Sequence, residues 1–108
     1  MLRHMPIVVM FLVAANPVGV PAIAESPLEV GRALAEANCA RCHNLEKAGE
    51  SPYAPAPPFR DIAKTYKATD LEEALVEGIV VGHPAMPEFE MTGEQAAAVA
   101  AFIDSLGH

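Results

Sequence analysis

The sequence Cys-Ala-Arg-Cys-His at residues 39–43 constrains this 108-residue chain more than any other feature. Cys39 and Cys42 are its only cysteines, and His43 directly follows the second one. The pattern C-x-x-C-H is typical of covalent haem attachment, because two thiols at this spacing can add to the two vinyl groups of one haem. The imidazole of His43 then lies under the iron and can bind it as an axial ligand. We therefore predict one haem c, attached through Cys39 and Cys42 and ligated by His43.

Three other interpretations of the two cysteines are open. A thioredoxin-like redox pair usually accompanies a βαβ pattern, and the sequence has no such pattern. A zinc site would need further ligands of the kind that a second cysteine pair provides, and no second pair follows. A plain disulfide at this spacing would close a tight loop with little entropic benefit.

The first 24 residues have the organisation of a secretory signal peptide. A short basic start precedes an unbroken apolar run at 7–15, and the small-x-small pattern at 22–24 matches a cleavage site. We predict that residues 1–24 are removed and that a single domain at 25–108 remains in the periplasm. The apolar run is too short to span a bilayer on its own. No stable membrane insertion is expected once the signal has been cleaved. An uncleaved anchor is the alternative.

The predicted mature domain is strongly acidic. All 14 Asp and Glu residues and six of the seven Lys and Arg residues follow position 24, so its side chains carry a net charge of −8. Nucleic acid is therefore not an expected partner, since its binding requires basic patches. The charge suits a partner with a positive docking surface, and simple solubility explains it equally well.

Capping signals and helical periodicity predict three to five short helices wrapped around the haem. Ser26 and Glu29 form a capping box that begins a first helix over 27–40, which delivers the cysteine motif at its end. A loop over 46–58 follows, because four prolines and a glycine exclude regular helix or central strand there. Apolar residues at the helical period then indicate a short second helix over 59–66.

Two further capping boxes predict the last two helices. Thr69 with Glu72 opens a third helix that Gly78 ends, and Thr92 with Gln95 opens the last helix. Because no strand signal is visible, we expect an all-α domain. The last helix carries an apolar stripe formed by Ala96, Val99, Phe102, Ile103 and Leu106.

A haem bound by one histidine has a second axial position. The candidates in the mature domain are Met86, Met91, His83 and His108. Met86 is preferred, because prolines on both sides stiffen its backbone and would hold the thioether on the iron at low entropic cost. A histidine–methionine pair favours ferrous iron and raises the reduction potential. Met91 adjoins the last helix and is expected in the core, His83 in a loop, and His108 at the chain end.

The order of these features resembles that of a small class I (mono-haem) bacterial cytochrome c over essentially the full length of the mature domain. The resemblance implies that the first helix packs across the last one near the haem. Gly31 and Ala35 match the positions of the first helix in this contact, and Val99 and Phe102 match those of the last. Ala35 departs from the aromatic residue that relatives often have there, which implies a lighter contact.

The resemblance also implies a proline whose carbonyl accepts a hydrogen bond from the proximal histidine. Pro57 best matches this residue, and Pro58 is the alternative. Phe59 would then line the haem pocket, and Tyr66 is a candidate to reach a haem propionate. The implied cofactor-binding set is thus formed by Cys39, Cys42, His43, Pro57, Phe59 and Met86, with His43 and Met86 on the iron.

The function implied by the resemblance is transfer of single electrons between redox protein partners by a monomeric carrier that is not an enzyme. Mitochondrial relatives carry a ring of lysines around the haem edge, whereas this chain has three lysines in all, so an acidic or apolar docking face is expected. Three alternatives are open. The chain could be a dedicated haem subunit of a larger dehydrogenase or oxidase, a ligand-binding or peroxidatic haem protein with a labile Met86, or a haem-free thiol-disulfide enzyme.

Overall fold

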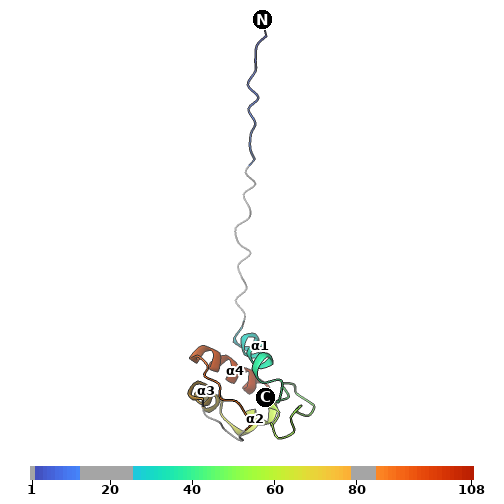
Figure 1. Ribbon diagram of the computed structural model, residues 1–108, viewed down its shortest axis with the longest axis vertical. Helices are drawn as coiled ribbons and strands as arrows, with labels where there is room; N and C mark the ends of the chain where they lie inside the picture. The colour runs from blue at the N-terminus through green and yellow to red at the C-terminus, as the bar shows by residue number, and fades with distance from the viewer. Residues whose placement is uncertain (1, 13–25, 79–84) are drawn as a thin grey trace.

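The computed structural model describes residues 2–12, 26–78 and 85–108. Its elements in chain order are α1 (Pro27–Asn38), α2 (Phe59–Thr65), α3 (Ala68–Glu77) and α4 (Gly93–Ser105). The described residues contain no strand, which confirms the prediction of a small all-α fold. Figure 1 shows the four helices gathered in one body.

Residues 2–12 form neither helix nor strand, and their apolar side chains are exposed. The predicted cleavage site after residue 24 lies outside the described residues, so the signal peptide stays a prediction. Among the described residues, no helix combines the length and the apolar character that crossing a bilayer requires.

Side-chain caps begin the first and last helices; the predicted capping box is complete at α4, and at α1 the structure shows the Ser26 half of it. The Ser26 hydroxyl accepts a hydrogen bond from the Glu29 backbone N–H at 3.3 Å, and a proline occupies the first turn of α1. At α4, the Gln95 N–H donates to the Thr92 hydroxyl at 3.2 Å, and the Thr92 N–H donates to the Gln95 side chain at 3.1 Å. These bonds use backbone donors that have no partner within the helix.

The start of α3 corrects the prediction. The helix begins at Ala68 with Lys67 as its N-cap, so Thr69 lies inside the first turn and does not cap it. The N–H groups of Asp70 and Leu71 both donate to the Lys67 carbonyl, which closes this turn without a side-chain cap. The predicted end is confirmed, because Gly78 adopts φ 73° in the left-handed region that glycine favours.

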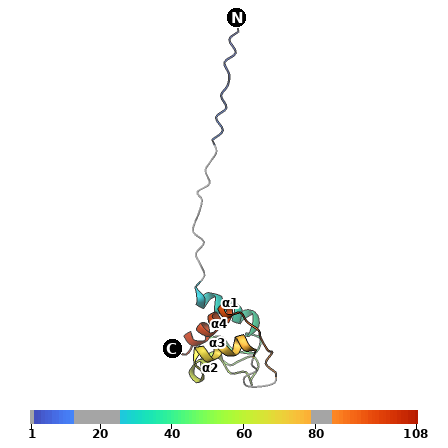
Figure 2. The ribbon, with the colours of Figure 1, turned by 90° about the vertical axis from the view of Figure 1, so that its left-hand side faces the viewer.

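Helix α4 lies at the centre of the fold and contacts each of the other three helices. Figures 1 and 2 show α1 crossing α4. Gly31 of α1 makes this crossing close. A Cβ atom at Gly31 would overlap the Ala98 carbonyl and lie 2.9 Å from Phe102 Cβ, and Ala35, one turn further on, is fully buried.

The packing predicts that Gly31→Ala is strongly destabilising. The added methyl group meets backbone atoms, which no rotamer change can move aside, so α1 and α4 must separate. We expect the free energy of unfolding of the haem-bearing domain to fall by about 3 kcal/mol in urea denaturation. Gly93→Ala is the matched control, because a Cβ there meets nothing within 4 Å, and it should change stability by less than about 1 kcal/mol. Equal effects of the two substitutions would refute the close crossing.

The core is small and consists largely of alanine. Eleven apolar residues of the described chain are buried, and six of them are alanines. Val99 is the largest side chain that is fully buried among the described residues. A core of this size gives a domain little stability by itself, so a large apolar cofactor would add much of the missing contact.

Candidate functional site

The cysteine motif lies where α1 leaves helical geometry. The helix ends at Asn38, two residues earlier than predicted, because Cys39 departs from helical angles with φ −120° and ψ −29°. The backbone N–H groups of Cys42 and His43 then both donate to the Cys39 carbonyl, at 3.1 and 2.9 Å. The resulting tight turn brings the two thiols and the imidazole together on one short segment, and both thiols are partly buried.

The His43 ring is buried and held from one side. Its exposed fraction is 8%, and its Nδ1 lies 2.7 Å from the Pro57 carbonyl oxygen. A carbonyl oxygen can only accept a hydrogen bond, so Nδ1 must carry a proton, and in the neutral imidazole Nε2 then carries the free lone pair. This is the tautomer that a haem iron requires of a histidine ligand. The hydrogen bond expected of Pro57 is present, and the Pro58 alternative is not needed.

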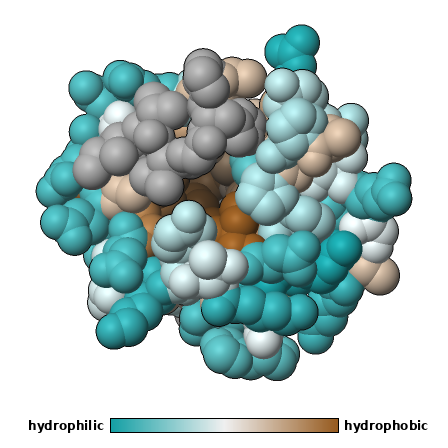
Figure 3. All heavy atoms as spheres, turned by 90° about the horizontal axis from the view of Figure 1, so that it is seen from below, coloured by the Kyte–Doolittle hydropathy of each residue, from teal (hydrophilic) through white to brown (hydrophobic). Residues whose placement is uncertain are grey.

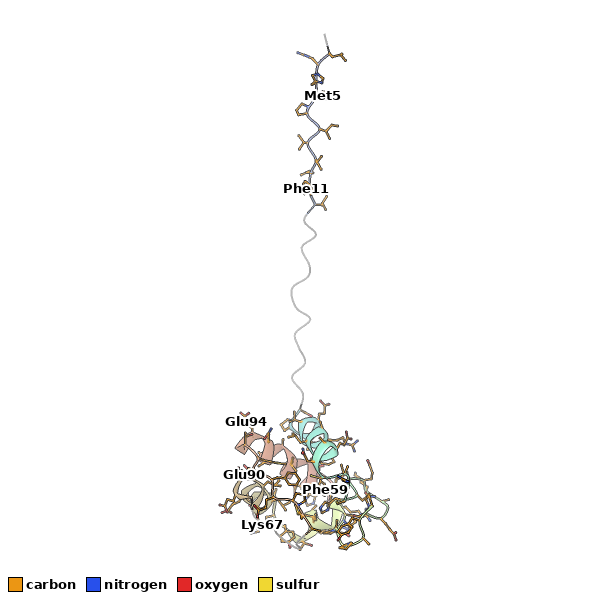
Figure 4. All side chains as sticks on the ribbon, viewed as in Figure 1. Met5, Phe11, Phe59, Lys67, Glu90 and Glu94 are labelled. Carbon is orange, nitrogen blue, oxygen red and sulfur yellow. The ribbon has the colours of Figure 1, made fainter. Side chains whose placement is uncertain are left out.

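The Phe59 ring packs beside the His43 ring. Its side chain is only 3% exposed, and its ring centre lies 5.3 Å from that of His43 at a tilt of 45°. The Phe102 ring of α4 meets Phe59 edge-on at 6.3 Å. Figure 4 shows Phe59 within the helical body rather than at its edge. These contacts link the imidazole to the α1–α4 crossing through two aromatic rings.

The apolar interior is visible from outside at one end of the molecule. Figure 3, in which the molecule is seen from below relative to Figure 1, shows apolar surface in a hollow, with hydrophilic and near-neutral side chains along part of its rim. An apolar recess with few polar groups suits a flat, mostly apolar cofactor. The two partly buried thiols on one turn and the buried His43 ring beside them are the groups that covalent attachment and ligation of a haem require.

The candidates for the second axial ligand have different surroundings. Met86 is partly buried in a turn and follows His83, which lies outside the described residues. Met91 packs against the core and donates its N–H to the Leu75 carbonyl at 3.1 Å, as expected of a core residue. His108 is exposed at the chain end, 3.4 Å from an Asp104 oxygen. The pairing of His43 with Met86 stays a prediction.

The two cysteines lack the properties of a redox-active pair. Burial raises the pKa of the Cys39 thiol to about 11, and the neighbouring Cys42 adds to the rise. A thiol-disulfide enzyme needs a thiol whose pKa is lowered, so this environment disfavours that alternative. The described part of the chain also has no cluster of three or more His, Cys, Asp or Glu residues that could hold a zinc ion.

Sequence reasoning missed the residues that shape the loop between His43 and α2. Asn44, Ser51 and Arg60 all make hydrogen bonds within this loop. These residues carry no periodic or capping signal, because their partners are backbone groups across an irregular segment. Tyr66, the candidate for a propionate contact, is 44% exposed and takes an extended conformation after α2.

These features are those of a c-type cytochrome domain: four helices, a C-x-x-C-H turn, and a buried histidine whose Nδ1 is bound to a proline carbonyl. A family model described as cytochrome c oxidase, cbb3-type, subunit III matches residues 26–103. The chain belongs to this family, a class I c-type cytochrome family, which makes it a haem-binding electron-transfer protein. Searches of curated proteins and of solved structures found no match.

Proposed function

We propose that this chain is an exported electron carrier with one haem c, attached through Cys39 and Cys42 and ligated by His43 and Met86. The observation that carries the proposal is the 2.7 Å hydrogen bond between His43 Nδ1 and the Pro57 carbonyl. It orients a buried imidazole and leaves Nε2 free for a metal. The haem supplies a one-electron iron couple when it is bound.

Each nearby residue has a task in this proposal. Pro57 holds the imidazole in one orientation and increases its basicity, as partners of metal-bound histidines do. Phe59 and Phe102 exclude water from that side of the ring. Met86 would supply the second iron ligand, which would leave no coordination site for a substrate, so the chain would not act as an enzyme. The signal-like residues 1–24 support a periplasmic location.

A visible absorption spectrum tests this proposal. The full chain is produced for export in cells that have haem-attachment machinery, and the purified protein is measured oxidised and reduced. We expect a sharp low-spin haem spectrum with the weak long-wavelength band of sulfur bound to ferric iron. Low-spin haem without this band would refute Met86 as the ligand, and a colourless protein would refute the cytochrome function.

The charge distribution supports a redox partner with a basic docking surface. No Lys or Arg follows Lys67, whereas eight Asp and Glu residues do. Figure 4 shows two of them, Glu90 and Glu94, at the edge of the helical body formed by α3 and α4. Residues 68–108, the acidic half of the predicted mature domain, would attract a positively charged surface at a distance.

The acidic half predicts a strong salt dependence of electron transfer. The rate with a cationic redox protein should fall by roughly tenfold between low and physiological ionic strength, because salt screens the attraction. Stopped-flow kinetics measure this rate. An anionic inorganic oxidant is the control and should react faster as salt is added. Rates with the cationic protein that do not change with salt would exclude charge-guided docking.

A second candidate function follows from the description of the family model, which names a subunit of an oxidase. In that case the domain would be a fixed haem subunit of a larger complex rather than a mobile carrier. Gentle extraction from the native cell followed by size-exclusion chromatography separates the two. Elution of the haem with a much larger protein supports the subunit, and elution at the size of the single domain supports the carrier.

A further inference from the structure

Asn44 lies at the start of the loop over 44–58, directly after His43. This loop has no regular helix or strand, so hydrogen bonds from individual groups determine its shape. Asn44 uses all four kinds of polar group that an asparagine has. Its backbone N–H donates to Ser51 Oγ (3.1 Å), its carbonyl accepts from Phe59 N–H (3.0 Å), its Oδ1 accepts from Glu46 N–H (2.7 Å), and its Nδ2 donates to the Glu50 carbonyl (3.0 Å).

Two hydrogen bonds join the two ends of the loop, and they start from adjacent residues, His43 and Asn44. One joins His43 Nδ1 to the Pro57 carbonyl, and the next joins the Asn44 carbonyl to the Phe59 N–H. A displacement of Asn44 relative to Phe59 would therefore also displace Pro57 relative to His43. The position of Asn44 thus determines how well the imidazole and its acceptor are aligned.

The rest of the loop packs closely around the Asn44 side chain. A Cβ atom at Gly49 would lie 3.0 Å from Asn44 Nδ2, and Gly49 has φ 99°, which residues with side chains rarely adopt. The Arg60 guanidinium of α2 donates to the Gly49 carbonyl at 2.7 Å. The Asn44 amide is therefore enclosed by loop backbone that α2 holds in place.

We propose that Asn44 is a positioning residue that keeps the Pro57 carbonyl bound to His43 and thereby sets the donor strength of the His43 imidazole toward the iron. The inference rests on the proposed function, in which His43 is an axial ligand of haem. A strong hydrogen bond from Nδ1–H to the Pro57 carbonyl makes Nε2 a better electron donor to the iron and stabilises ferric iron. Weakening that bond should raise the reduction potential.

The test compares Asn44→Ala with the wild type in the haem-bearing protein. One readout is the exchange rate of the His43 Nδ1 proton, measured by NMR in the reduced state, and the other is the reduction potential. Loss of two side-chain hydrogen bonds should make exchange roughly tenfold faster, and the potential should rise. A purely structural role would lower stability and leave the potential unchanged.

Asn38→Ala is the matched control. Asn38 is an exposed asparagine, whereas Asn44 is half-buried, and the Nδ2 of Asn38 donates to the Leu34 carbonyl within α1 at 2.8 Å and not to the loop. Both readouts should keep their wild-type values in this variant. The proposal is overturned if Asn44→Ala and Asn38→Ala give the same exchange rate and the same potential.

Ser51→Ala decides the question if Asn44→Ala does not accumulate. It leaves Asn44 in place and removes only the hydroxyl that accepts its backbone N–H. Both readouts should shift in the same direction as in Asn44→Ala, by a smaller factor, and wild-type values would overturn the proposal. The spectrum of the wild type distinguishes failure of this inference from failure of the proposed function. A wild type without histidine-ligated haem would refute the proposed function, whereas a wild type with such haem and unchanged variants would refute only the role of Asn44.

Discussion

Replacing His43 with alanine should abolish the folded, haem-bearing form of the domain. The substitution removes the proposed proximal ligand, its hydrogen bond to Pro57 and its ring contact with Phe59. The remaining core is largely alanine, so little apolar packing is left to hold the helices together. Loss of a metal ligand of this kind should cost about 4 kcal/mol or more, a large part of the stability of a small domain.

The yield of coloured protein and its thermal unfolding, followed by circular dichroism, measure this loss. We expect little haem-bearing protein and no cooperative transition. His108→Ala is the control, because that side chain is exposed at the chain end and its one described contact is with Asp104. It should match the wild type in both measurements. A His43→Ala protein that folds cooperatively and cycles between oxidised and reduced forms would refute the whole interpretation of the site.

Replacing Met86 with alanine should leave the haem attached but change its chemistry. The proposed attachment uses Cys39 and Cys42, which the substitution does not touch. Loss of the thioether would remove the proposed ligand that favours ferrous iron, so the reduction potential should fall by about 0.2 V, a fraction of the roughly 0.8 V that axial ligands span. The vacant position should then bind carbon monoxide rapidly in the reduced state. Redox titration and flash photolysis measure the two effects.

Met91→Ala is the matched control for Met86→Ala. Met91 packs against the core, so its truncation should lower the free energy of unfolding by about 2 kcal/mol while the potential and ligand exclusion stay at wild-type values. The opposite pattern, with the potential changed by Met91→Ala and not by Met86→Ala, would exchange the roles of the two methionines. Rapid carbon monoxide binding by the wild type would instead favour a ligand-binding haem protein with a labile Met86.

Local signals in the sequence predicted much of the helical framework. Ser26 and Thr92 cap their helices and Gly78 ends α3, because a cap involves residues three or four positions apart. The prediction failed at Thr69, where the motif is present but the chain is already helical. The first turn there closes on the Lys67 carbonyl instead. A capping pattern gives a possible helix start, and the course of the incoming backbone decides between neighbouring starts.

The sequence by itself determined the haem-attachment motif, the helical class and the approximate ends of the helices. Each of these depends on residues close together in the chain, whose spacing is set by backbone geometry. The family resemblance implied that the Pro57 carbonyl meets His43 and that Gly31 lies in the helix crossing, and the structure shows the atoms in contact. The tertiary structure alone decided that Gly31 meets the Ala98 carbonyl and that Asn44 holds the loop to Phe59. These contacts join segments separated along the chain, so they exist only after the helices have packed and brought the segments within hydrogen-bonding or van der Waals distance.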